Sequence, residues 1–208
     1  MDFSLKKFIK HYKSIYGVVT GLLCSIPVIS SFFSGKIERY LFPPLGNFDT
    51  VGRIFAIVII VLVSITTYFA KDLHLIQNKQ RRFILLLKML LACIAFYLLF
   101  FILNICFVKT ITLPDDNETI INVSIGYERQ NWAKEKLNGT SDYEILTKKR
   151  GPYEREIQNV WTLTSLVIVR ASLLLSYISF FVIAVSISSL FILFDYFDLE
   201  ENQIAKST

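Results

Sequence analysis

Apolar residues along the chain are gathered in four long blocks with polar segments between them. The blocks are Ile15–Phe33, Ile54–Ala70, Phe83–Val108 and Ala171–Phe194. A helix needs about 20 apolar residues to cross a hydrocarbon core of ~30 Å, and each block is close to that length or longer. The pattern predicts an all-α membrane protein with four transmembrane helices.

A polar insertion lies between the third and the fourth predicted helices. Within it Ile121 and Val123 alternate with polar residues, which predicts a strand. Residues 130–137 are predicted to form a short helix, residues 143–147 a second strand, and residues 138–139, Asn-Gly, a turn. The insertion is therefore expected to be a small mixed α/β domain that faces outward.

The last helix is predicted to begin before the membrane. Apolar positions recur at helical spacing from Tyr153 through Ile157 and Val160, and the next apolar block follows without a proline or glycine. An unbroken helix from Pro152 to Phe194 would be about 60 Å long at 1.5 Å per residue. Such a helix would couple the insertion mechanically to the membrane.

The chain is expected to have three parts. Residues 1–108 hold a basic lead and the first three transmembrane helices, residues 109–160 the insertion, and residues 161–208 the fourth transmembrane helix and an acidic tail.

Composition and charge agree with a membrane protein. Hydrophobic residues make up 53% of the 208 residues and charged residues 19%, against roughly 25% charged in an ordinary soluble domain. Lysine and arginine concentrate in the lead and in residues 71–82, which places both termini in the cytoplasm. The net charge of +5 is therefore a topology signal, and direct binding of nucleic acid is not expected.

The cytoplasmic segments carry charged side chains that a protein partner or lipid could contact. These residues are Lys6, Lys7, Lys10, Lys79, Arg81, Arg82, Asp198, Glu200 and Glu201.

Small residues at regular spacing mark two of the predicted helices as packing surfaces. They are Gly17, Gly21 and Ser25 in the first helix, and Ser165, Ser172, Ser176, Ser179 and Ser186 in the fourth. Such spacing lets helix backbones approach closely and lets hydroxyls bond within or between helices. Three alternatives stay open for the serine stripe: packing within one chain, a homo-oligomer seam, or a hydrophilic pore.

Arg170, directly before the last apolar block, is the odd charge of the predicted fourth span. Counting about 20 residues back from Phe194 places the outer membrane boundary near Leu174. The side chain either reaches the interface from there or, if the helix lies deeper, is a functional intramembrane charge.

The sequence predicts no enzyme. His11 and His74 do not pair with cysteines or carboxylates at metal-binding spacing, and no phosphate-binding or hydrolase motif occurs. No catalytic residue, metal ligand or cofactor site is therefore expected. Three glycosylation sequons, at Asn117, Asn122 and Asn138, leave a eukaryotic accessory protein as a minor alternative.

The whole-chain architecture resembles the KwaA family, the membrane subunits of bacterial Kiwa anti-phage systems. The resemblance rests on the basic lead, four spans, a basic inner hairpin, the outer insertion and the acidic tail. Two distinctive stretches, Tyr127–Gln130 and Tyr153–Glu156, have no role assigned by it.

The resemblance implies a homo-oligomer, a tetramer, in the bacterial inner membrane. It would sense phage at the envelope and hold a cytoplasmic, DNA-binding KwaB-like partner. Apart from the resemblance, the outer sensing surface of the insertion is expected at Tyr127, Arg129, Trp132, Tyr153 and Arg155. The alternative function is a channel or membrane-disrupting effector whose fourth helix lines the path.

Overall fold

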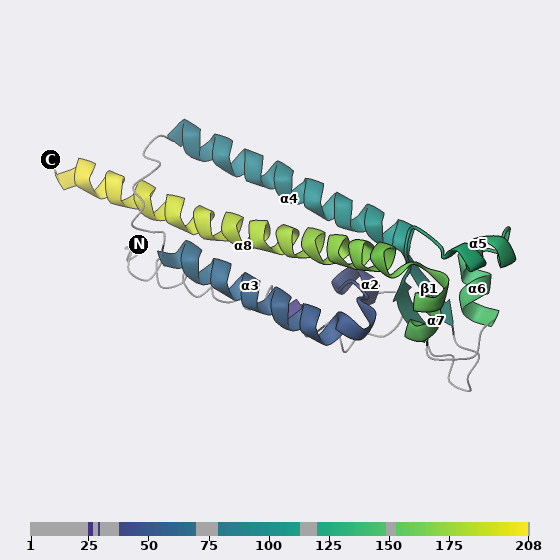
Figure 1. Ribbon diagram of the computed structural model, residues 1–208. Helices are drawn as coiled ribbons and strands as arrows, with labels where there is room; N and C mark the ends of the chain where they lie inside the picture. Colours follow the sequence, from purple (N-terminus) through teal and green to yellow (C-terminus); the bar gives the residue numbers. More distant parts are fainter. Residues whose placement is uncertain are drawn as a thin grey trace. The chain divides into compact units, whose positions relative to one another are not determined.

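The computed structural model describes residues 25–26, 29, 38–69, 79–112, 120–148 and 153–207 (Figure 1). The chain divides into two compact units. One comprises Met1–Ser25, Ile57–Ala95 and Ile178–Thr208, and the other comprises Ile26–Ala56 and Phe96–Tyr177. The second unit contains the insertion together with the adjoining parts of the long helices.

Three long helices dominate the described residues. They are α3 (Asp49–Phe69), α4 (Lys79–Phe107) and α8 (Leu163–Ser207). Within them Phe83–Phe107 and Leu163–Ser188 are long and apolar enough to cross a membrane, which agrees with the third and fourth predicted spans. The second predicted span forms α3, whereas most of the first lies outside the described residues. Crossing by those two stays a prediction.

A two-stranded antiparallel sheet begins where α4 ends. Strand β1 (Val108–Thr112) pairs with β2 (Ile120–Ser124), with Val108 opposite Ser124. The amide of Ile125 then donates to the Phe107 carbonyl over 2.8 Å, which ties the end of β2 to the end of α4. The strand at β2 was predicted, but β1 was not, because its first residue continues the apolar block of the third span.

The second predicted strand of the insertion, residues 143–147, is wrong. After α5 (Asn131–Lys136) and a turn in which Gly139 has φ 80°, the chain forms helix α6 (Asp142–Lys148). Ile145 and Leu146 are both buried in one core. Adjacent side chains point to opposite faces of a strand, whereas neighbours on a helix can share one face. Burial of both side chains therefore favours the helix.

The unbroken helix from Pro152 to Phe194 is also wrong. Helix α7 (Tyr153–Val160) ends at Val160, and α8 begins at Leu163. Between them Trp161 forms an antiparallel bridge with Arg129. The Gln130 amide donates to the Val160 carbonyl, which replaces a bond that a continuous helix would make. The long last helix therefore starts at Leu163 instead of Pro152.

The insertion has a hydrophobic core of its own. It is formed by Ile111, Val123, Ile125, Ala133, Ile145, Leu146, Ile157, Val160, Trp161 and Leu166. These residues come from the sheet, from the three short helices, from the first turn of α8 and, for Ile125 and Trp161, from the segments directly after β2 and α7. The core thus extends past residue 160 and includes the start of the last helix.

The segment before α3 packs within the same unit. Helix α2 (Glu38–Leu41) and the 3-10 turn η2 (Gly46–Phe48) precede α3. The side-chain Nδ2 of the buried Asn104 of α4 donates to the Arg39 carbonyl over 2.6 Å. Phe42 and Phe100 both make edge-on contacts with the Tyr177 ring of α8.

Candidate functional site at the junction of the insertion and α8

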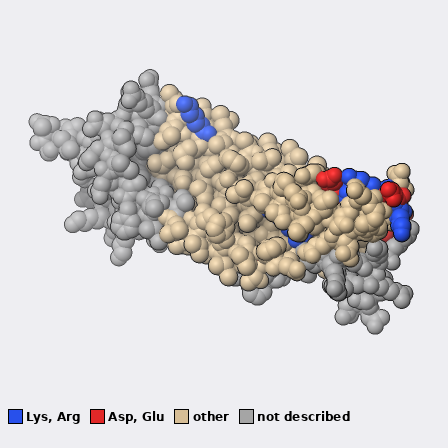
Figure 2. Space-filling model, in the orientation of Figure 1, with Lys and Arg blue, Asp and Glu red and all other residues tan. Residues whose placement is uncertain are grey.

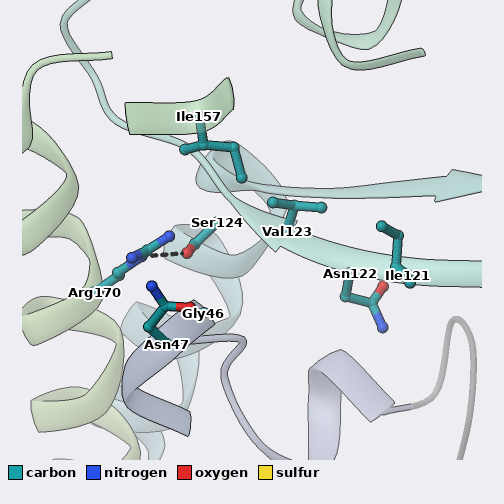
Figure 3. Close-up of a pocket in the computed structure, with 8 residues that line it drawn as sticks. All are labelled: Gly46, Asn47, Ile121, Asn122, Val123, Ser124, Ile157 and Arg170. Atoms are coloured by element: carbon teal, nitrogen blue, oxygen red, sulfur yellow. Dashed lines mark hydrogen bonds between the residues drawn. The ribbon is translucent and has the colours of Figure 1, made fainter. Parts of the chain in front are cut away.

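Arg170 joins α8 to the insertion. Its side chain is 7% exposed, and its Nε donates to the Ser124 hydroxyl over 2.9 Å (Figure 3). Ser124 ends β2 and is itself buried. The guanidinium head therefore lies inside the protein, facing the insertion. The two alternatives that the sequence left open for Arg170, a charge that reaches the interface and a functional intramembrane charge, both stay predictions.

Ser165 makes the second connection. Its hydroxyl lies 3.2 Å from the Glu128 carbonyl and 2.9 Å from the Thr162 carbonyl. The Thr162 amide also donates to the Glu128 carbonyl over 3.0 Å. The bonds from the Ser165 hydroxyl and the Thr162 amide both end at the Glu128 carbonyl. The start of α8 is therefore hydrogen-bonded to the segment after β2.

Gly126 allows this close approach. A Cβ built at residue 126 would overlap the Ser165 hydroxyl and would lie 3.1 Å from the Trp161 Cβ. The residue is buried and packs its backbone directly against α8. Only glycine leaves room for that contact. We name Ser124, Gly126, Glu128, Ser165 and Arg170 the junction.

The sequence interpretation missed three junction residues, Ser124, Gly126 and Glu128. A signal was present, because Ser124 and Gly126 occupy alternate positions of the predicted strand, which extends to Tyr127. Small residues there are typical of close backbone approach, but nothing local identified α8 as the element that approaches.

Arg129 has a structural position, not that of an open sensing residue. Its guanidinium donates to the carbonyls of Leu137 and Thr140 at 3.1 and 3.0 Å and pairs with Asp142 at 2.6 Å. It thereby fixes the turn between α5 and α6. Figure 2 shows charged side chains gathered over this part of the insertion.

The other predicted outer residues differ in exposure. Tyr127 is 56% exposed and available to a partner. Trp132 is partly exposed, and its indole Nε1 donates to the Asn159 carbonyl over 2.9 Å. Tyr153 and Arg155 lie in α7, with side chains outside the described part.

The serine stripe of α8 is bonded mostly within its own helix. Ser176 donates to the Leu173 carbonyl over 3.0 Å and Ser186 to the Val182 carbonyl over 2.8 Å. Ser172 and Ser179 are half-buried. Ser165 alone among the stripe residues bonds to the insertion. Among the three alternatives for the stripe, packing within one chain therefore explains where Ser165 lies.

The predicted cytoplasmic contacts are placed only in part. Lys79, Arg81 and Arg82 lie in the first turn of α4, and Asp198, Glu200 and Glu201 lie in α8, which continues through the predicted tail. Their side chains are not described. The residues Lys6, Lys7, Lys10, Gly17 and Gly21 lie outside the described residues, and Ser25 is described as helical.

Glu38 is an ionisable group near β2. Its Oε1 lies 3.5 Å from Arg53 Nη2. Burial raises the pKa of the Glu38 carboxyl above its ordinary value, and the Arg53 charge opposes that rise without cancelling it. The charged form is therefore less favourable in the fold than in water.

A cavity of about 180 Å³ adjoins the junction (Figure 3). It is lined by Gly46, Asn47, Ile121, Asn122, Val123, Ser124, Ile157 and Arg170. Among the described residues, no cluster of three or more His, Cys, Asp or Glu side chains could hold a metal ion. Comparison with protein-family models, curated proteins and solved structures finds no match to this chain.

Proposed function

We propose that this chain is a four-span membrane protein that acts as a sensor or scaffold subunit of a bacterial anti-phage defence complex. The observation that carries the proposal is the junction. The insertion holds α8 through Ser124–Arg170 and Glu128–Ser165, and the two α8 residues are about 1.4 helical turns apart. A displacement of the insertion would therefore move the last helix.

The membrane location in the proposal is supported by the apolar side chains that α4 exposes on its surface. Leu91, Leu98 and Ile102 are about half exposed, at 59%, 50% and 56%. Large apolar side chains can pack against lipid acyl chains, whereas soluble proteins rarely expose a large contiguous apolar patch to water. The proposed location is the bacterial inner membrane, with both termini in the cytoplasm as the charge distribution predicts.

The proposed mechanism passes from the insertion to α8. An event at the outer surface, where Tyr127 is exposed, would shift β2 and pull on Arg170 and Ser165. The cytoplasmic end of α8, with Asp198 and Glu200, would then change how it holds a partner. The KwaB-like, DNA-binding identity of that partner and the tetrameric assembly rest on the resemblance to KwaA.

The coupling is tested with a Gly-Pro insertion after Leu174, which breaks α8 on the cytoplasmic side of the junction. The matched control carries the same insertion at the exposed Asn138-Gly139 turn. Protection against phage, measured by efficiency of plating, should be lost in the first variant and kept in the second, with equal amounts in the membrane. Equal protection by both variants would refute the lever.

Assembly is tested by extraction in mild detergent after co-expression with a KwaB protein. Native mass measurement should give a tetramer that carries KwaB. A monomeric chain that releases KwaB would contradict the scaffold proposal.

The channel alternative has weaker support. The hydroxyls of Ser176 and Ser186 bond to carbonyls of α8 itself and so need neither water nor ions as partners. Ion flux through liposomes that contain the purified chain separates the two functions, since only the channel predicts leakage.

A further inference from the structure

The cavity beside the junction gathers polar side chains from three separate parts of the chain. Arg170 comes from α8, Ser124 from β2 and Asn47 from η2. Figure 3 shows these three side chains converging on the cavity, while Ile157 and Val123 form an apolar wall. Gly46, at φ 64°, begins the 3-10 turn and so presents Asn47 at the cavity.

The cavity is positively charged. Of its eight lining residues, Arg170 alone carries a charge. Asn122 turns its amide elsewhere: its Oδ1 accepts from Thr110 over 2.8 Å, and it bonds to the Glu38 carboxyl. A buried guanidinium beside a cavity attracts an anion, because desolvation strengthens its field.

We infer that this cavity binds a phosphate group. Arg170 would supply the charge, and the Ser124 hydroxyl and the Asn47 amide would add hydrogen bonds. The Nε bond to Ser124 holds the guanidinium in one orientation, so the site is formed before the ligand arrives. One water takes about 30 Å³ of liquid, so 180 Å³ accommodates a group the size of phosphate.

Apolar side chains beside the cavity indicate a phospholipid as the source of that phosphate. Phe48 follows Asn47 in η2, and Phe48, Val51 and Phe55 are 58%, 63% and 51% exposed. Their spacing of three and four residues places them on one side of the chain. Acyl chains would cover this apolar surface while the phosphate enters the cavity. This source, though not the phosphate site, rests on the proposed membrane location.

The probes are dihexanoyl-phosphatidylglycerol, inorganic phosphate and dihexanoylglycerol, which has the same acyl chains without phosphate. Each is titrated against the purified full chain in mild detergent, and the shift in Tm gives an apparent Kd. We expect the phospholipid to raise Tm and dihexanoylglycerol to have no effect. A shift with inorganic phosphate at equal concentration would support the site and identify a free anion as its source.

Two variants decide whether the cavity is responsible. Asn47→Asp adds a negative charge at an exposed position of the rim, and Asn138→Asp adds the same charge at an exposed turn of the insertion away from the cavity. The first should weaken phospholipid binding about tenfold or more, as expected for loss of one charge-assisted hydrogen bond. The second should leave binding unchanged.

Arg170→Gln removes the charge and keeps a donor for Ser124, and it should abolish the shift. If that variant does not fold, the two aspartate variants still decide. Equal shifts by phospholipid and dihexanoylglycerol, no shift with any probe, or equal binding by both aspartate variants would overturn the inference. The readout uses neither phage nor a partner, so its failure is distinct from failure of the sensor proposal.

Discussion

Gly126→Ala should destabilise the insertion by closing the space that Ser165 occupies. The new Cβ would overlap the Ser165 hydroxyl and lie 3.2 Å from the Ser165 Cβ. Overpacking of this kind costs typically about 1–3 kcal/mol. Gly126 has no positive φ, so alanine also restricts the unfolded chain and returns about 0.4–1 kcal/mol. The expected net loss is therefore about 1–2 kcal/mol.

A second substitution separates the overlap from other effects. Ser165→Ala alone removes one hydroxyl donor, which lies within hydrogen-bonding distance of the Glu128 and Thr162 carbonyls, and should cost about 1 kcal/mol. In Gly126→Ala/Ser165→Ala the overlap with the hydroxyl is gone, so the pair should lose about 1 kcal/mol less than the sum of the single losses. Ser172→Ala, one heptad further along α8, is the matched control and should add to Gly126→Ala without coupling.

The assay follows the fluorescence of Trp161 during guanidinium unfolding in detergent. The chain has two tryptophans, and Trp132→Phe leaves the buried Trp161 as the sole reporter of the insertion core. Linear extrapolation gives the free energy of unfolding for each variant. Additive losses for Gly126→Ala and Ser165→Ala, within about 0.5 kcal/mol, would refute the packing argument.

Three further predictions use the same assay. Gly139→Ala should cost about 1 kcal/mol and Gly139→Asn less, because φ is 80° and a Cβ meets nothing within 4 Å; equal losses would contradict a backbone origin. Burial raises the pKa of Glu38, so the free energy of unfolding should fall as pH rises from the ordinary value of 4.5 through the raised pKa. Glu38→Gln should flatten this pH dependence, and an unchanged profile in that variant would contradict the role of Glu38. Arg129→Lys should cost about 1–2 kcal/mol, because Nη1 and Nη2 of the planar guanidinium reach the two loop carbonyls and Asp142 from different positions, whereas lysine has a single nitrogen. A loss near zero would show that the turn holds without these bonds.

Long apolar blocks were the part of the fold that could be predicted from sequence. Helices α4 and α8 coincide with two long apolar runs. A helix is expected for such runs because it pairs its backbone N–H and C=O groups within the segment. Strand β1 was missed although Val108 and Ile111 are its buried positions, because Val108 also continues the apolar run of α4. Periodicity cannot separate the end of a helix from the start of a strand when one residue satisfies both.

The errors in the insertion came from contacts distant in sequence. The pattern Tyr153, Ile157, Val160 continues smoothly into α8, and only the bridge between Trp161 and Arg129 interrupts it. Likewise, nothing around Arg170 reveals that Ser124 is its partner, 46 residues away. The sequence therefore identified Arg170 as an unusual charge. It could not identify the partner of Arg170, because that contact joins residues far apart in the chain.

The core of the insertion has a consequence for the order in which the chain can be completed. Synthesis delivers β1 and β2 first, but the core also requires Trp161 and Leu166, and Ser124 waits for Arg170. The core of the insertion can therefore be completed only after the first turns of α8 have been made. A nascent or truncated chain that stops before Leu166 would leave this core open to proteases and chaperones. Completion of the insertion core thus depends on synthesis of the start of α8.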